Sequence, residues 1–141
     1  MGHVFHSPEQ SLATDTLRRY LAAEVEPLFS RTYRDRFMPR DVMAGLMQRL
    51  TSFGLVSGIV SEEHGGLGLD WLGSLMLFEE VAAASVDLSI PVLINSFGAH
   101  LLEKVAPPQL RERHLPGVVA GERFVSSGIS EPGAGSNVLE V

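Results

Sequence analysis

Hydrophobic residues recur at three- and four-residue spacing through the first part of the chain, which is the period of an amphipathic helix. This run follows Ser7-Pro8-Glu9-Gln10, a sequence typical of a capping box in which serine and glutamine close the start of a helix. Pro27 falls late in the run, and we expect it to kink or end the helix near the following turn. The apolar face of this helix consists of Leu17, Tyr20, Leu21, Val25, Leu28 and Phe29.

The same spacing predicts four further helices. Gly54 follows the second of them and suits a left-handed backbone, and Asp70 is placed to cap the third. Between them, residues 55–60 predict a turn or a strand, and the glycine-rich residues 61–68 predict a loop. The fourth helix is apolar nearly all round, so we expect it to be the most buried one. The second helix begins at Pro39 and the third after Asp70. The fourth runs from Asp87 or Ser89 to about Val105, and the fifth runs from Pro107-Pro108 to about Val119.

The last part of the chain predicts extended backbone. Arg123 to Ser127 is the first segment that suits a strand, and residues 128–137 predict a loop because of their glycine and proline content. A single strand has no neighbour for its backbone groups. It therefore either pairs with another chain, or the sequence stops partway through a protein. The predicted fold class is all-α, an orthogonal or up-down bundle of about five helices followed by one strand and a loop.

Composition excludes several classes of protein. The chain has 141 residues, 45% of them hydrophobic, and a formal net charge of −6. This acidic balance argues against a nucleic-acid partner, and no stretch is long and apolar enough to span a membrane. The absence of cysteine excludes disulfides and thiolate chemistry, although by itself it leaves the compartment open. We find no secretory signal near Met1 and expect a cytoplasmic location.

Two glycine-rich stretches are candidates for ligand binding. Residues 65–71 lack the third glycine of the dinucleotide fingerprint, so a tight connection between helices is the better interpretation. Residues 130–137 combine serine hydroxyls with Gly133 and Gly135, which let a backbone approach a ligand closely. Such a loop suits a polar planar ring or a pyrophosphate. An ordinary surface turn is equally compatible with the bare pattern.

The titratable residues predict no metal site. His64, His100 and His114 have no partner of ligand character three or four residues further on, as helical ligand sets usually require. Neighbouring carboxylates in a helix diverge by about 100°. We therefore interpret Glu62-Glu63 and Glu79-Glu80 as solvated faces.

Five segments taken together resemble the acyl-CoA dehydrogenase family, and their order and spacing agree along about residues 8 to 141. Each segment matches a family pattern: Ser61 to Gly68 resembles P-E-E-Y-G-G-x-G, Phe78 to Ala82 resembles F-E-E-[LV]-A, Asn95 to Gly98 resembles N-S-x-G, Leu115 to Glu122 resembles L-P-x-[LV]-x-x-G-E, and Ser130 to Ser136 resembles T-E-P-x-A-G-S. One such match is weak evidence, whereas five in register are specific.

The resemblance implies an N-terminal helical domain over residues 7–122 and the start of the family's middle β-domain over residues 123–141. It implies FAD as the cofactor, with the flavin loop supplying Ser127, Ile129, Ser130, Gly135 and Ser136. Ser136 would also contact acyl-CoA, and the acyl pocket would be lined by Ser89, Ile90, Leu93 and Phe97. Core packing is the alternative interpretation for these apolar positions. The family usually has threonine at Ser130 and aspartate at Asn137; the first difference keeps the hydroxyl.

By the same resemblance, the complete protein would convert an acyl-CoA to a trans-2-enoyl-CoA, with electron-transferring flavoprotein as electron acceptor and a homo-oligomer or partner chain completing the site. The family's catalytic base lies in a C-terminal bundle, and no residue of this sequence matches it. We therefore expect this chain alone neither to hold FAD tightly nor to be catalytic. Two alternatives stay open: a related flavin oxidase, of the acyl-CoA oxidase or nitroalkane oxidase type, and a non-catalytic helical binding module.

Overall fold

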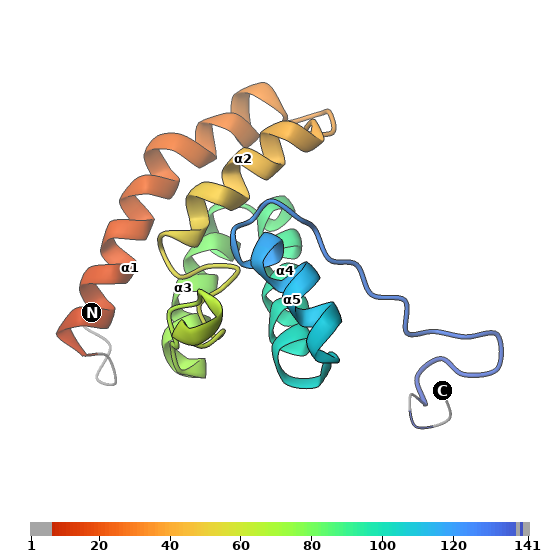
Figure 1. Ribbon diagram of the computed structural model, residues 1–141. Coiled ribbons are helices and arrows are strands. Elements are labelled where there is room, and N and C mark those ends of the chain that lie inside the picture. Colours follow the sequence, from red (N-terminus) through yellow and green to blue (C-terminus); the bar gives the residue numbers. More distant parts are fainter. Residues whose placement is uncertain (1–6, 138, 140–141) are drawn as a thin grey trace.

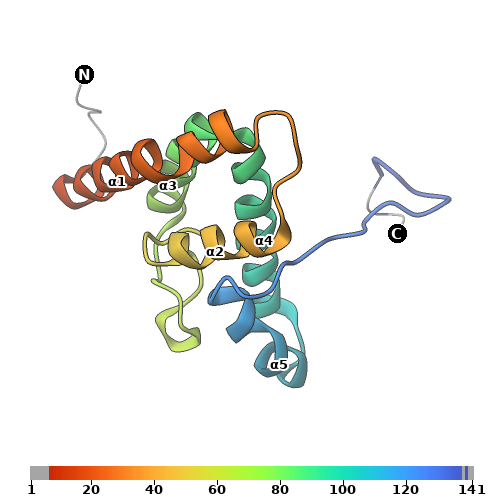
Figure 2. The ribbon, with the colours of Figure 1, turned by 90° about the horizontal axis from the view of Figure 1, so that it is seen from above.

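Five α-helices form the body of the molecule, and the computed structural model describes residues 7–137 and 139. Helix α1 packs against α3, and α4 packs against both α3 and α5 (Figure 1). The view from above shows α1 and α3 running side by side, with α2 lying to one side of them (Figure 2). The predicted all-α class is confirmed for this part of the chain. The helices are α1 (Pro8–Tyr20), α2 (Arg40–Thr51), α3 (Trp71–Ala84), α4 (Val86–Val105) and α5 (Pro108–Val119), with a 3-10 turn at Glu62–His64.

Side-chain caps start three of these helices. At α1, the Gln10 N–H donates to the Ser7 hydroxyl and the Ser7 N–H donates to the Gln10 side chain, so the predicted capping box is confirmed. Asp70 accepts from the N–H of Gly73 at 2.7 Å, as predicted for α3. The Ser85 hydroxyl caps α4 by accepting from Leu88, so α4 begins earlier than the predicted Asp87 or Ser89.

The first helix continues past Pro27. Two π-helical segments, Leu21–Val25 and Leu28–Thr32, lie on either side of this proline. Proline has no N–H to donate to the carbonyl four residues earlier, and wider turns around it let the chain keep its helical course. The helical course ends at Thr32, in the turn that follows Pro27, where a kink or an end was predicted, and Pro27 itself is accommodated by a local widening.

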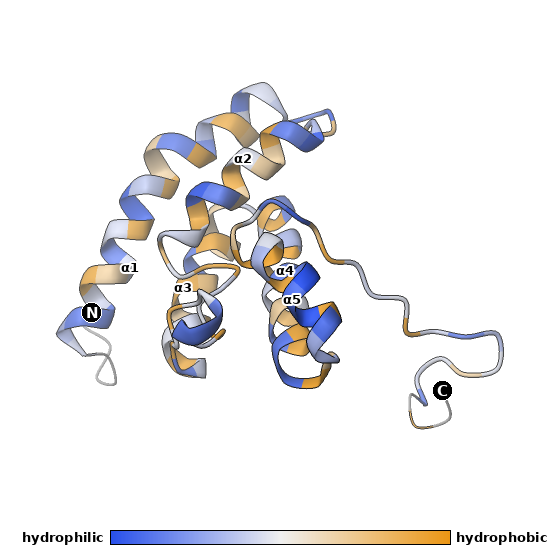
Figure 3. Ribbon diagram, in the orientation of Figure 1, coloured by the Kyte–Doolittle hydropathy of each residue, from blue (hydrophilic) through white to orange (hydrophobic). Residues whose placement is uncertain are grey.

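The core lies where α1, α2, α3 and α4 meet. Its fully buried members include Leu17, Leu46, Leu50, Val81 and Val92. A second, smaller apolar cluster joins α4 and α5 to the end of the turn formed by residues 52–60. The alternation of hydrophilic and hydrophobic residues along α1 and α2 is visible in Figure 3. Burial of one face of each amphipathic helix is thus the main source of stability.

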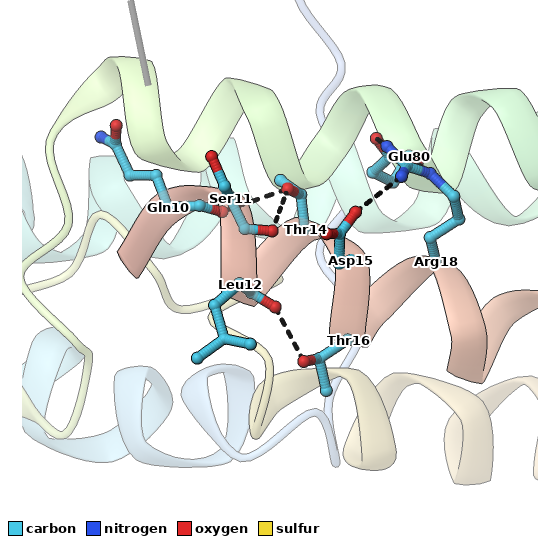
Figure 4. A network of polar contacts seen from close by, with 8 residues as sticks. All are labelled: Gln10, Ser11, Leu12, Thr14, Asp15, Thr16, Arg18 and Glu80. Atoms are coloured by element: carbon cyan, nitrogen blue, oxygen red, sulfur yellow. Dashed lines mark hydrogen bonds and ion pairs between the residues drawn. The ribbon is translucent and has the colours of Figure 1, made fainter. Parts of the chain in front are cut away.

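An arginine ties α1 to α3 (Figure 4). The Arg18 guanidinium donates to both carboxylate oxygens of Glu80, at 2.6 and 2.9 Å, and also to Asp15 at 2.8 Å. Glu80 keeps only 17% of its side chain exposed. The interpretation of Glu79-Glu80 as a solvated face is therefore wrong for Glu80, because a residue 62 positions away supplies its partner.

After α5, the chain leaves the helical body as an arm of extended backbone, residues 123–137 (Figure 1). The strand predicted at 123–127 does not form: within residues 7–137 and 139, the structure has no strand, only an isolated bridge between Glu131 and Ala134. A strand needs a neighbour to share its ladder hydrogen bonds, and the described residues supply none. Within the same residues, no helix has both the length and the apolar character needed to cross a bilayer.

Candidate functional site

Helix α4 carries a stripe of apolar side chains that the rest of the described chain covers only in part. The stripe consists of Ile90, Leu93, Phe97 and Leu101, which are 55%, 44%, 46% and 39% exposed. Their three- and four-residue spacing places them on one face. The expectation that α4 is the most buried helix is therefore wrong for this face. Core packing, the alternative interpretation of the predicted pocket residues, does not describe these half-exposed side chains.

Ser89 lies apart from the stripe. It is 4% exposed, and its hydroxyl donates to the Val86 carbonyl at 2.9 Å. A buried hydroxyl that is satisfied within its own helix is not available to a ligand. Of the four residues predicted to line the acyl pocket, the structure thus places Ile90, Leu93 and Phe97 together on an accessible surface and Ser89 beneath it.

An apolar cavity opens between α3, α4 and the turn of residues 52–60. It has a volume of about 80 Å³. Trp71, Leu75, Leu93 and Phe97 line its exposed side, whereas Leu55, Val56 and Val92 are buried. Ser74 and Ser96 are its polar lining residues. An apolar cavity with few polar groups is typical of a site for the hydrocarbon part of a ligand.

A second apolar groove, of about 230 Å³, lies between α4 and the start of the arm. Phe97 and Leu101 line it together with Val125, Ser126 and Ser127. Phe97 therefore borders both hollows. The groove brings a residue predicted to contact the cofactor, Ser127, next to a residue predicted to contact the substrate, although 30 positions separate the two.

Two residues of α4 hold the arm in this position. The side chain of Asn95, 1% exposed, donates to the Arg123 carbonyl and accepts from the Val125 N–H, both at 2.8 Å. One turn later, Gly98 leaves room for Val125: a Cβ at Gly98 would lie 2.4 Å from a Val125 methyl. These contacts explain physically why asparagine and glycine occupy the two ends of the Asn95–Gly98 motif.

The other predicted cofactor residues lie further along the arm. Ile129, Ser130, Gly135 and Ser136 are exposed, and a Cβ added at Gly135 would have no neighbour within 4 Å. Two backbone hydrogen bonds between Glu131 and Ala134 fold this part of the arm into a turn. The arm thus offers hydroxyls and accessible backbone suited to one edge of a flavin, without an enclosed pocket among the described residues.

Glu103 is a buried charge that the sequence analysis did not single out. It is 5% exposed on α4, and its Oε1 accepts from the Ser61 N–H at 2.8 Å. His64 Nδ1 lies 3.3 Å from Oε1, and Lys104 Nζ lies 3.1 Å from Oε2. Burial raises the pKa of Glu103, but hydrogen bonds from Ser61, Lys104 and His64 outweigh it and hold the pKa at about 2. Glu103 thereby ties the loop of residues 61–68 to α4 as a carboxylate.

His100 also faces this carboxylate. Its Nδ1 lies 4.0 Å from Glu103 Oε2, and its ring meets the Trp71 ring edge-on. The expectation that His100 has no partner of ligand character three or four residues further on is therefore wrong, because Glu103 lies three residues after it. Glu103 also lies beside His64, which is distant in sequence. In the part of the chain that the structure describes, no group of three such residues is arranged to hold a metal ion.

The same helical architecture occurs in solved structures of other proteins. Acyl-CoA dehydrogenase complexed with FAD from Bacillus anthracis superimposes with a TM-score of 0.80 at 23% identity, over 100% of this chain and 24% of that one. The ChsE4–ChsE5 complex from Mycobacterium tuberculosis gives a TM-score of 0.76 at 24% identity, over 99% of this chain and 35% of that one. At these identities the likeness shows the fold.

The sequence comparisons show the family. The family model described as "Acyl-CoA dehydrogenase, N-terminal domain" matches residues 7–122. Mitochondrial isovaleryl-CoA dehydrogenase from Solanum tuberosum is 28% identical over 133 residues, which cover 90% of this chain and 31% of that protein. The chain belongs to the acyl-CoA dehydrogenase family, as the resemblance predicted. It spans about a third of the length of the curated relatives that it matches.

Proposed function

We propose that this chain is the N-terminal portion of an FAD-dependent acyl-CoA dehydrogenase, which oxidises an acyl-CoA thioester to the trans-2-enoyl-CoA. The observation that carries the proposal is the exposed apolar stripe of α4, with Phe97 bordering both the cavity and the groove that contains Ser127. An enzyme that removes hydrogen from an acyl chain needs such an apolar wall beside its cofactor.

In this reaction the substrate loses a proton from Cα and a hydride from Cβ. FAD, when bound, would take up the hydride. The described residues would contribute binding and orientation: Leu93 and Phe97 would exclude water from the acyl chain, and the hydroxyls of Ser130 and Ser136 would donate hydrogen bonds to polar edges of cofactor and substrate. The catalytic base would come from a segment outside this chain.

The proposal includes a division of the chain at residue 122. Residues 7–122 would form the N-terminal helical domain, and residues 123–141 would begin the middle β-domain, in which the arm would pair with further strands. Residues 138, 140 and 141 lie outside the described part. Electron-transferring flavoprotein would accept the electrons, and further chain, a second copy or a partner chain would complete the site. We propose a cytoplasmic location, although the relatives from Solanum tuberosum and Dictyostelium discoideum are mitochondrial enzymes.

The test uses the complete gene product, purified with and without any companion chain. We expect bound FAD, seen by visible absorbance after gel filtration, and reduction of electron-transferring flavoprotein on addition of acyl-CoA. Formation of peroxide instead would indicate a flavin oxidase. If the reading frame ends at Val141 and no companion chain restores activity, the molecule is a non-catalytic helical module and the proposal fails.

A matched pair of variants tests the apolar wall. Leu93→Ser replaces a half-exposed leucine of the stripe, and Leu12→Ser replaces a leucine on α1 that is 65% exposed. Because both changes remove the same apolar group from a surface position, they should differ little in stability. Leu93→Ser should raise the KM for acyl-CoA severalfold, whereas Leu12→Ser should leave it unchanged. Equal KM values for the two variants would show that the stripe does not contact substrate.

A further inference from the structure

One of the buried residues that line the cavity between α3 and α4 has a costly backbone conformation. Val56 has φ +72° and is the non-glycine residue with positive φ in the described chain. A β-branched side chain in the left-handed region is a true outlier, because its Cβ crowds the following carbonyl. Gly54, two residues earlier, has φ +82° without this cost. Strain of this kind points to a function for the side chain that causes it.

The surrounding turn holds Val56 in this conformation. The Leu55 N–H donates to the Leu50 carbonyl at 3.2 Å, and the Leu69 N–H donates to the Gly58 carbonyl at 2.7 Å. Gly66 packs so closely that a Cβ there would lie 2.0 Å from the Val60 carbonyl oxygen. The turn is therefore fixed on both sides of Val56, and the valine side chain, 1% exposed, is one of the buried groups that line the cavity.

We propose that Val56 sets the depth of an acyl subsite and limits the inserted part of the acyl group to about three carbons. An apolar cavity of about 150 Å³ accommodates benzene, with six carbons. The cavity here, of about 80 Å³, therefore holds about half as many. An acyl group enters between Trp71 and Phe97, fills the cavity with its terminal carbons, and leaves the rest of its length on the α4 stripe. Only the identity of the ligand as an acyl group rests on the proposed function.

The chain carries its own reporter for this subsite. Trp71 is the only tryptophan, and it lines the cavity. We would titrate the 141-residue chain with S-acyl-N-acetylcysteamine thioesters from acetyl to octanoyl and follow Trp71 fluorescence. Each buried methylene contributes about 0.8 kcal/mol, which is about fourfold in affinity. Affinity should rise by about that factor per carbon until about three carbons are buried, and by less than twofold per carbon afterwards.

We call the chain length at which the steep rise in affinity ends the break. Substitutions at Val56 and at the α3 wall of the cavity should move this break in opposite directions. Val56→Ala removes two carbons from the cavity lining, so the steep part of the series should extend by about two carbons. Ser74→Val adds bulk to the α3 wall of the same cavity and should shorten it. Val118→Ala makes the same change in the separate cluster of α5 and should leave the break in place. Val56→Gly, which also removes the backbone strain, provides a second test if the alanine variant folds poorly.

Three results would overturn the proposal. If the affinity rises evenly from acetyl to octanoyl, the cavity has no depth limit. If the break is unchanged in both Val56 variants and in Ser74→Val, Val56 and Ser74 do not set that limit. No fluorescence response to any thioester would show that the cavity is not an acyl subsite. The test is separable from the proposed function: a shifted break in a protein whose complete form lacks dehydrogenase activity supports the subsite alone, and an active enzyme with an unshifted break supports the activity alone.

Discussion

Replacing Glu103 with glutamine would measure what one buried carboxylate contributes to stability. Its pKa is lowered from 4.5 to about 2 in the folded chain, and only 4% of the side chain is exposed. At about 1.4 kcal/mol per pKa unit, this shift corresponds to about 3 kcal/mol at neutral pH. Because folding favours the ionised form, this contribution is fully present above pH 4.5 and is lost as the pH falls toward 2. By pH 3, about 2 kcal/mol of it should be gone.

The assay is urea unfolding of the wild-type chain and of Glu103→Gln at pH 7 and at pH 3, followed by Trp71 fluorescence. Glutamine keeps the shape of the side chain but does not titrate. The advantage of the wild type should therefore be larger at pH 7 than at pH 3 by about 2 kcal/mol. Glu79→Gln, an exposed change on α3, is the control and should show no such difference. An advantage that does not depend on pH would refute the reasoning.

The remaining predictions concern the arm and the helix ends. Gly98→Ala should destabilise the chain by about 1–3 kcal/mol, because its Cβ would collide with Val125; hydrogen exchange at the Val125 amide should accelerate at the same time. Gly45→Ala, with no neighbour within 4 Å, should instead stabilise α2 by about 0.5–1 kcal/mol in thermal unfolding. Asp70→Ala should cost about 1 kcal/mol by removing the α3 cap, and Asp70→Ser should restore most of it. In a verified monomer, the amides of residues 126–129 should exchange at nearly unprotected rates; strong protection there would contradict the absence of a sheet partner.

Local features were predictable because their causes are close in sequence. The capping box at Ser7 and the cap at Asp70 depend on groups three residues apart. The helical periods follow from side-chain spacing, so helices were placed to within a few residues. Details were missed where this local reasoning is weakest: α4 begins earlier because Ser85 caps it, and spacing gave no sign of the wider turns on either side of Pro27.

Contacts between distant residues were not predictable from spacing. Arg18 reaches Glu80, and Glu103 reaches Ser61, across separations of 62 and 42 residues. A signal for Glu103 did exist, since a glutamate in an otherwise apolar stretch of a helix requires a partner if it is buried. The sequence also places Glu103 three residues after His100, on the same side of a helix. The contact with His64, in contrast, depends on how the loop of residues 61–68 folds onto α4.

Spacing and motifs in the sequence were enough to identify the helices, the family and the apolar residues Ile90, Leu93 and Phe97 as a group. Helix periodicity could not tell a buried face from an exposed one, because both consist of the same residue types. Only the folded chain shows that the α4 stripe is half-exposed while Ser89 is buried, and that Val56 is one of the buried residues lining the neighbouring cavity. The tertiary structure also decided that Arg123 to Ser127 forms an arm held by Asn95 and Gly98 and not a strand, because a strand exists only where a second strand shares its hydrogen bonds.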